Sequence, residues 1–395
     1  MNHLEKLKRG LSTVLSALIS VAIGLAFGFI ILFLLSLSTY ASAGEPFTLK
    51  QVFDTAYNEG FLRLMKGCFY MVRRGLKTEI SQAAPLIMTG LSVAFAFKTG
   101  LFNIGAAGQY TLGAFGALYC AIVLKLPWYL CLLASVLFGA VWGAIPGFFK
   151  AYFKINEVIT SIMFNWIGLY AVNTLIYGGG TGAMYCAKTT KTWVIGSGVY
   201  EGTTIPNISV FLSEKPQGLG LYLKDTSIAI FFAIIIAIIL YIIINKTTFG
   251  YEIRACGHSQ TAAKYAGISE KRNIILSMAI AGGLAGFGAG LYYLSGVAEW
   301  QPLVSTSLPG FGFDGISVAL LASSNPIGVI FSALFIAHID VGGGYMNASF
   351  FPREIADIVS GIIIYLCAFM LLFKTAISKG ISRVFGAKKE LEGGK

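Results

Sequence analysis

The feature that most constrains this chain is a series of long apolar runs separated by short polar segments. Ile228–Ile244 is an unbroken run of seventeen apolar residues, and residues 14–37 form another long run. A helix needs about 20 apolar residues to cross the hydrocarbon core of a bilayer. Apolar residues make up 56% of the chain and charged residues only 12%, about half the charged share of a soluble protein. This composition indicates an integral membrane protein and excludes a soluble enzyme, a disordered chain and a disulfide-stabilised secreted domain.

The apolar runs predict an all-α fold, a polytopic membrane helix bundle of about ten membrane segments with broken or half helices. The run at 313–323 is too short to cross a bilayer alone, so we expect a half-helix that enters the membrane and turns back. The predicted segments are 14–37, 80–97, 108–124, 128–149, 157–177, 226–244, 274–296, 313–323, 326–343 and 355–373.

The distribution of basic residues predicts the orientation of these segments. With both termini in the cytoplasm, the inner segments hold 16 Lys and Arg in 71 residues and the outer ones 12 in 116. Cytoplasmic loops are enriched in Lys and Arg, so this orientation in a plasma membrane is favoured. It gives a cytoplasmic segment 1–13, a transmembrane domain 14–373 and a cytoplasmic tail 374–395. The predicted loops are 40–79 (external, with a surface helix), 178–225 (external) and 245–273 (cytoplasmic).

Two sets of glycines recur every four residues, which places each set on one helix face. Such a stripe lets a neighbouring backbone approach closely, and close packing without a direct role in function is the favoured interpretation. The glycines concerned are Gly139, Gly143, Gly147, Gly282, Gly286 and Gly290.

Three polar stretches interrupt the apolar pattern, and the first is residues 97–109. It holds three glycines, a lysine and the amides Asn103 and Gln109 between two apolar runs. Unwound backbone at membrane depth is tolerated where it is buried or lines a cavity, and transporters use it beside the solute. We expect Asn103 and Gln109 to line a substrate path for a polar, uncharged solute; the alternative is a plain cytoplasmic turn.

The second stretch, residues 156–167, opens a span with polar side chains. Asn156 is a predicted N-cap, and Glu157 then lies at the positive end of the helix dipole. Asn165 lies deeper in the span, where an amide needs a partner or a wet cavity. Helix–helix bonding and lining of the path are equally compatible with Asn165.

The third stretch, residues 249–269, lies on the predicted cytoplasmic side. Ser259 as N-cap and Gly267 as C′ residue frame a helix of about two turns. Because two turns are unstable alone, the helix must dock. It either lies on the inner rim of the bundle or inserts into a separate cytosolic subunit.

These stretches resemble the permease subunits of ATP-binding-cassette importers, in the branch that handles nucleosides and, more distantly, ribose-like sugars. GLFNIGAAGQYTLGAFGA (100–117) is similar to the broken-helix motif of that branch, and NEVITSIMFNWI (156–167) to its next motif. FGFDGISVALLASSNPIGVIFSALF (311–335) resembles its short eighth segment and the helix that follows. The loop 249–269 resembles its coupling loop, with matches at Gly250, Arg254, Gly257, Ala262, Ala263 and Gly267.

The resemblance implies a bundle similar to the vitamin-importer permease fold, with two related permease subunits around one path. It also implies an extracellular solute-binding lipoprotein and a cytosolic ATP-binding subunit that the coupling loop contacts. The expected function is ATP-driven import of nucleosides by alternating access, with ribose-like sugars as the alternative solute. Asp314 opens the short segment and is a fourth candidate for the substrate path, although a helix-dipole partner is an equal interpretation.

No residues form a catalytic or metal-binding pattern. The sequence has no GxxxxGK[ST] motif, so ATP must be used by a partner subunit, and we expect no enzyme activity and no cofactor in this chain. The six cysteines and three histidines are scattered, so no metal site is predicted, and the basic residues flank apolar runs rather than form a nucleic-acid surface. An ion-coupled secondary transporter is the second hypothesis; it would need intramembrane ionisable residues and has no use for a docked helix. A multipass membrane enzyme lacks any catalytic constellation.

Overall fold

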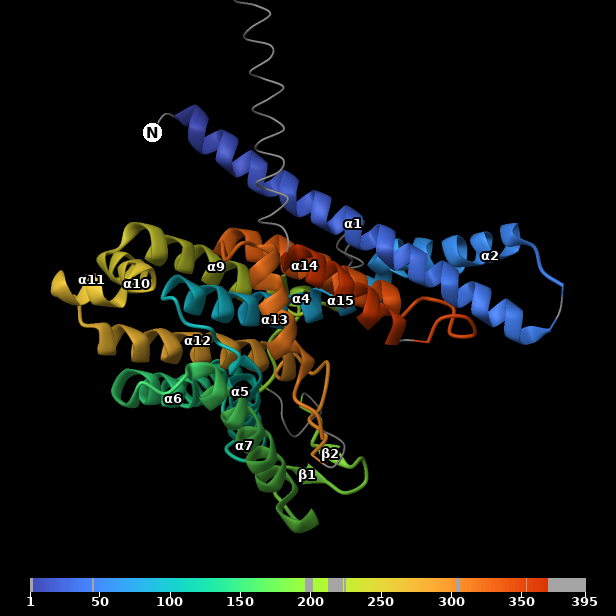
Figure 1. The fold of residues 1–395 in the computed structure, drawn as a ribbon. Coiled ribbons are helices and arrows are strands. Elements are labelled where there is room, and N and C mark those ends of the chain that lie inside the picture. Colours follow the sequence, from blue (N-terminus) through green and yellow to red (C-terminus); the bar gives the residue numbers. More distant parts are fainter. Residues whose placement is uncertain are drawn as a thin grey trace, which may run out of the picture. The chain divides into compact units, whose positions relative to one another are not determined.

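The computed structural model describes residues 3–44, 46–195, 202–211, 223, 225–302, 306–352 and 354–368. These residues are almost entirely helical (Figure 1). Seven helices are long and apolar enough to cross a membrane: α1 (His3–Ala43), α4 (Val72–Lys98), α6 (Trp128–Phe153), α7 (Glu157–Tyr177), α9 (Ala229–Lys246), α12 (Glu270–Tyr293) and α14 (Pro326–Gly343).

Three shorter helices fall on the remaining apolar runs: α5 (Ala106–Ile122), α13 (Gly310–Leu321) and α15 (Glu354–Ala368). Every predicted membrane segment therefore coincides with a helix, and the predicted all-α polytopic bundle is confirmed. The predicted half-helix is the twelve-residue α13, about 18 Å long at 1.5 Å per residue. The tail 374–395 and parts of the loop 178–225 lie outside the described residues.

Two segments expected to be mainly loop contain more helix than the sequence suggested. Within 40–79 the structure has several short elements: α2 (Leu49–Thr55), the π-helix η1 (Ala56–Phe61), α3 (Leu62–Lys66) and the 3₁₀ turn η2 (Gly67–Phe69). Val52, Ala56 and Leu64 are buried there, which a solvated loop would not allow. Within 245–273 there are two helices, α10 (Thr248–His258) and α11 (Gln260–Tyr265), where one was expected.

The loop 178–225 carries the strands found in the described residues. β1 (Tyr185–Cys186) and β2 (Lys191–Thr192) pair antiparallel, with Tyr185 opposite Thr192. The same loop holds two 3₁₀ turns, η3 (Gly178–Gly180) and η4 (Ile208–Phe211). Thr192 also exchanges hydrogen bonds with the backbone of Trp300, so this loop is fixed to the α12–α13 connection.

The chain divides into two compact units, residues 1–70 with 338–395, and residues 71–337. In the first unit α1 packs on α15. Val359 Cγ1 of α15 lies 2.8 Å from the position that a Cβ at Gly28 would take.

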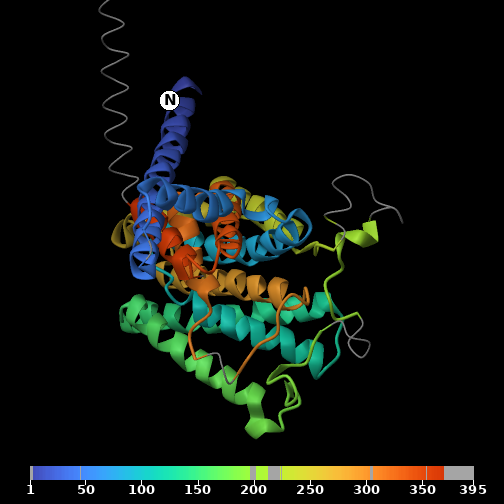
Figure 2. The same ribbon diagram turned by 90° about the vertical axis from the view of Figure 1, so that its right-hand side faces the viewer.

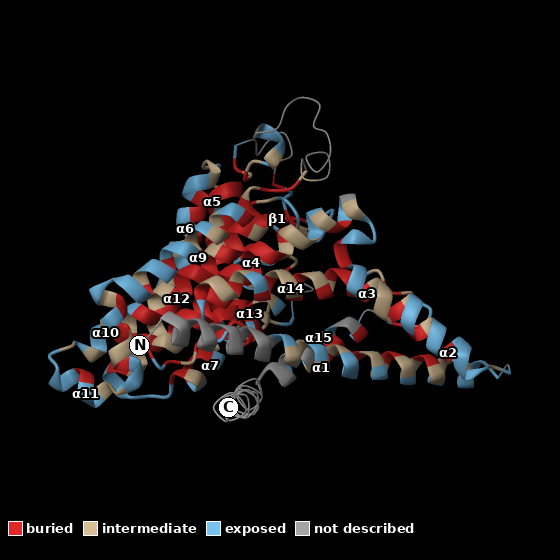
Figure 3. Cartoon of the chain, turned by 90° about the horizontal axis from the view of Figure 1, so that it is seen from above, coloured by how far each residue is buried: buried red, intermediate tan, exposed pale blue. Residues whose placement is uncertain are grey.

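The second unit is organised around α12. Figures 1 and 2 show α12 between α4 and α6, and both helices pack on it extensively. The central position of α4 follows from its burial, since 83% of its most apolar window is inside the structure. Figure 3 shows the ribbon around α4 mainly in red, the colour of buried residues. The helices α6, α7 and α9 instead expose large apolar side chains such as Leu137, Met163 and Ile239. These side chains suit contact with lipid.

The two glycine stripes form one interface between α6 and α12. A Cβ at Gly143 would lie 2.9 Å from Gly282 Cα, and one at Gly139 would lie 2.9 Å from Gly286 Cα. Gly147 faces Met278, one helical turn further along. The helix backbones are therefore in direct contact over several turns, which glycine permits because it has no side chain.

Candidate functional site

The first predicted motif is a true break between two helices. α4 ends at Lys98 and α5 begins at Ala106, with Thr99–Gly105 non-helical between them. Gly100 has φ +72°, a conformation that glycine adopts without strain. The Thr99 hydroxyl donates to Ser277 Oγ on α12 at 2.9 Å. The break is thus anchored in the bundle rather than solvated as a plain turn.

The amides predicted to line the path pair with each other. Asn103 Nδ2 donates to Gln109 Oε1 at 2.8 Å, and Gln109 Nε2 donates back to Asn103 Oδ1 at 3.0 Å. Asn103 Nδ2 also donates to Ser92 Oγ on α4 at 3.1 Å. Asn103 and Gln109 are 0% and 1% exposed. This buried pair ties the break to the first turn of α5.

Asn165 bonds the break to α7. Its Oδ1 accepts from the backbone N–H of Gly108 at 2.8 Å, and its Nδ2 donates to the carbonyl of Ile104 at 3.0 Å. Gly108 lies in the first turn of α5, where backbone N–H groups have no partner inside the helix, so Asn165 caps α5 from a neighbouring helix. Asn165 is the ninth residue of α7, about 12 Å along it. The end of the break that joins α5 therefore lies at membrane depth.

We expect Asn165→Leu to lower the free energy of unfolding by about 2 kcal/mol, because it leaves a buried N–H and a buried C=O without partners. Thermal unfolding of the detergent-solubilised chain measures this change. Asn245→Leu is the matched control, since Asn245 is exposed at the end of α9. Equal melting temperatures for the two variants would contradict the capping role.

The start of α7 has the predicted cap. Asn156 Oδ1 accepts from the backbone N–H of Val158 at 2.8 Å, and Glu157 occupies the first helical turn. Glu157 also forms a 2.8 Å ion pair with Lys150 at the end of α6. This ion pair joins the two ends of the short turn between α6 and α7. It gives Glu157 a structural role that needs no part in transport.

Asp314 does not open the short segment. α13 begins at Gly310, after Pro309, so Asp314 lies in the second turn. The dipole of a helix acts mainly within the first turn, which weakens that interpretation. Asp314 is half-buried, and it is not part of the Asn103–Gln109 pair. The structure thus brings Asn103, Gln109 and Asn165 together at the break.

The coupling segment folds as two helices with defined ends. Thr247 caps α10, and Ser259 caps α11 by accepting from the Ala262 N–H at 3.2 Å. α11 ends in a Schellman motif: Gly267 has φ +79°, and Gly267 and Ile268 donate to the carbonyls of Lys264 and Ala263. The predicted cap and C′ residue of this helix are therefore both present.

The glycines and alanines predicted for coupling divide into inward and outward positions. Ala263 is 3% exposed and faces its own chain, whereas Ala262 and Gly267 are exposed. Gly250 allows α10 to fold back tightly on the last carbonyls of α9, and Arg254 Nε donates to the Gly250 carbonyl at 3.2 Å. Tyr265 on α11, which the sequence did not single out, is 94% exposed.

Gly257 connects the coupling segment to the break. A Cβ there would meet the carbonyl of Lys98 and would lie 3.1 Å from the Gly100 backbone nitrogen. The backbone of α10 therefore touches the backbone of the α4–α5 break. A polar pocket of about 350 Å³ lies beside this contact, lined by residues from both segments, among them Thr99, His258 and Thr261.

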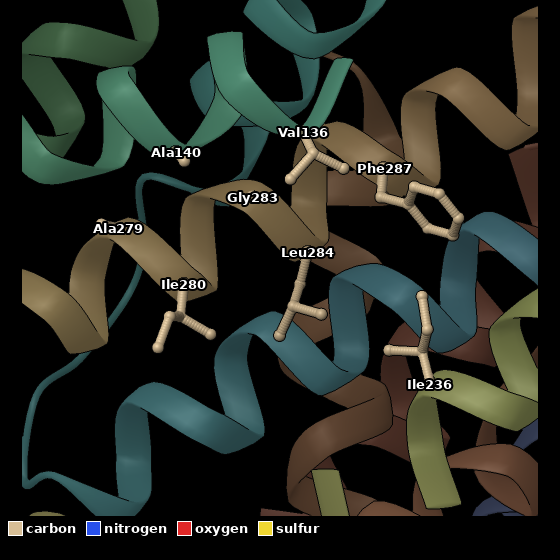
Figure 4. Close-up of a pocket in the computed structure, with 8 residues that line it drawn as sticks. All are labelled: Val136, Ala140, Ile236, Ala279, Ile280, Gly283, Leu284 and Phe287. Atoms are coloured by element: carbon tan, nitrogen blue, oxygen red, sulfur yellow. The ribbon is translucent and has the colours of Figure 1, made fainter. Parts of the chain in front are cut away.

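A second pocket of about 350 Å³ lies between α6, α9 and α12 (Figure 4). The side chains of Val136, Leu284 and Phe287 point into it, with Ile236 from α9 on the opposite side. Its lining offers no polar side chain, so it suits an apolar chain and not a polar solute.

Comparison with known proteins places this geometry in a family. Residues 76–368 match the family described as branched-chain amino acid transport system / permease component. The chain is 36% identical to the guanosine ABC transporter permease protein NupP of Bacillus subtilis, over 91% of this chain and 94% of that protein. It is 35% identical to the nucleoside ABC transporter permease protein NupB of Lactococcus lactis, over 78% of this chain and 82% of that protein. It is 29% identical to the glucose ABC transporter permease protein TsgB13 of Haloferax volcanii, over 76% of this chain and 77% of that protein. No solved structure matches the chain.

The family match covers the break, the α7 motif, the coupling segment and α13 together. A multi-pass helical chain with these motifs in this order belongs to the permease components of ABC transporters, in the branched-chain amino acid transport system / permease family.

Proposed function

We propose that this chain is one permease subunit of an ATP-driven importer in the plasma membrane and that its solute is a nucleoside. The observation that carries the proposal is the identity of 36% and 35% to a guanosine and a nucleoside permease over most of the chain. The glucose permease is less similar, at 29%. A ribose-like sugar is therefore the second candidate solute.

The partner that supplies energy is a cytosolic ATP-binding subunit. This chain has no GxxxxGK[ST] motif for nucleotide phosphates, and exposed residues of α11 offer a docking surface. The contact of Gly257 with the break supports a direct mechanical route from the ATPase to the helices. Both chain termini lie on the ATPase side in this proposal, and a solute-binding lipoprotein delivers the nucleoside to the opposite side.

The second partner is a related but different permease. Bacillus subtilis has a second guanosine permease protein, NupQ, to which this chain is 29% identical, and Lactococcus lactis has a second nucleoside permease protein, NupC, at 24%. The higher identity to NupP and NupB identifies the kind of subunit that this chain resembles. We infer that this chain pairs with a second, non-identical permease subunit that is similar to NupQ and NupC.

An ion-coupled carrier is less well supported by the structure. Such a carrier needs ionisable groups inside the membrane, but Glu157 is at the start of α7, in an ion pair with Lys150. Lys98 is the last residue of α4, at the end of the break that touches α10 of the coupling segment.

Uptake of radiolabelled guanosine and ribose tests the proposal in cells with this chain intact or deleted, before and after ATP depletion. We expect deletion to abolish guanosine uptake and ATP depletion to have the same effect, because import is driven by ATP. Loss of ribose uptake alone would favour the sugar importer. Uptake that survives ATP depletion but stops when the ion gradient collapses would overturn the proposal.

A further inference from the structure

Two buried hydroxyl groups beside the first turn of α5 have no hydrogen-bond partner among the described residues. They are Ser161 Oγ from α7 and Tyr110 Oη from α5, in residues that are both 0% exposed. Leaving a buried hydroxyl unpaired costs free energy, and alanine or phenylalanine would fill the same space without that cost. Unpaired buried polar groups in a native structure call for an explanation.

Ser161 belongs to a polar cluster that surrounds Gly105. A Cβ at Gly105 would lie 3.1 Å from Ser161 Oγ, 3.1 Å from Gln109 Nε2 and 3.2 Å from Asn103 Oδ1. Three polar atoms from three segments therefore converge on Gly105, closer to its backbone than a residue with a side chain would allow. Donors and acceptors of this kind suit the hydroxyl groups of a sugar.

Tyr110 belongs to an aromatic cluster on the other side of the same turn. Its ring centroid is 5.8 Å from Phe311 of α13 and 6.3 Å from Tyr293 of α12. Tyr292 is 4.9 Å from Phe311, and Trp300 is 5.8 Å from Tyr293. Trp300 is held in place because its Nε1 donates to Asn173 Oδ1 at 2.8 Å.

The two clusters meet at consecutive residues, because Gln109 faces the polar cluster and Tyr110 the aromatic one. Successive side chains on a helix point about 100° apart. The first turn of α5 therefore has polar groups on one side and aromatic rings on the other. A nucleoside has the same division, since a flat base that stacks on aromatic rings is joined to a ribose that carries hydroxyl groups.

We propose that the first turn of α5 holds the nucleoside in transit, with the base against the aromatic cluster and the ribose at the polar cluster. Tyr110 Oη hydrogen-bonds to the base, and Ser161 Oγ to a ribose hydroxyl. The rings contact one another, so the base enters where the half-buried Tyr292 and Phe311 move apart. This inference rests on the proposed nucleoside substrate.

The test is the maximal rate of ATP-dependent guanosine uptake by the full importer carrying Tyr110→Phe. We expect this rate to fall roughly tenfold, the effect of one lost hydrogen bond. The melting temperature should stay the same or rise, because the variant removes only an unpaired hydroxyl. Tyr119→Phe is the matched control on the same helix, since Tyr119 is 39% exposed, and it should leave uptake unchanged.

A second measurement uses 8-azidoguanosine, photoactivated on membranes that contain the assembled importer. Attachment to peptides that include Tyr110, Tyr292 or Phe311 is expected, and Ser161→Ala should reduce it. Attachment confined to other segments, or a wild-type uptake rate in Tyr110→Phe, would overturn the inference. A fall in uptake together with a fall in melting temperature would also overturn it, because the hydroxyl would then be structural. If the wild-type importer takes up no guanosine, the proposed function itself fails.

Discussion

Replacing Gly282 with leucine is expected to abolish accumulation of the folded protein in the membrane. A Cβ at Gly282 would meet the carbonyl oxygen of Gly139 and would lie 2.9 Å from Gly143 Cα. Both neighbours are backbone atoms of α6, so no side chain can rotate away. A leucine forces α6 and α12 apart and breaks contacts along the whole interface. We expect the free energy of unfolding to fall by more than about 4 kcal/mol, a larger decrease than most single substitutions cause.

Gly361→Leu is the control for this experiment. Gly361 lies on α15, and a Cβ there would meet no atom within 4 Å. The same change of residue should therefore leave the amount of protein in the membrane, measured by immunoblot, close to wild type. Gly282→Ala, which adds a smaller side chain, should reduce the amount of protein in the membrane less than Gly282→Leu does. Normal membrane levels of Gly282→Leu would mean that the α6–α12 backbone contact does not exist in the membrane.

The helices of this fold could be predicted because lipid imposes a simple rule on sequence. A spanning helix must be apolar over most of its length, so each run could be read directly, including the short α13. The caps at Asn156 and Ser259 could also be predicted, since capping depends only on neighbours in the chain.

Contacts between segments that are far apart in the sequence could not be predicted in this way. The four-residue glycine spacing predicted two smooth helix faces but did not show that Gly143 and Gly282 face each other. Asn103 and Gln109 were predicted to be polar groups at membrane depth, yet their reciprocal pairing depends on the path of the backbone through the break. α10 was missed because its mixed polar sequence resembles a loop, although Thr247 is a good N-cap.

Tyr265→Ala is expected to uncouple the permease from its proposed ATPase while the chain still folds. α11 has only six residues and is held by Ser259 at its start, by Gly267 at its end and by Ala263 facing inward. Tyr265 takes no part in that packing, since it is 94% exposed. Exposed aromatic anchors often carry about 2 kcal/mol or more of an interface. ATPase affinity and nucleoside uptake should thus fall roughly thirtyfold.

Copurification of the ATPase with the tagged chain measures the effect, together with the melting temperature of the chain alone. Tyr129→Ala is the control, because Tyr129 is also exposed, at 57%, but lies at the opposite end of α6 from Lys150. Ala263→Arg should behave differently and lower the melting temperature, since Ala263 is buried in its own chain. If Tyr265→Ala retains the ATPase at the wild-type level, α11 is not the docking helix. The exposed Tyr251 would then place the docking surface on α10, and α10 would reach the break through Gly257 without α11.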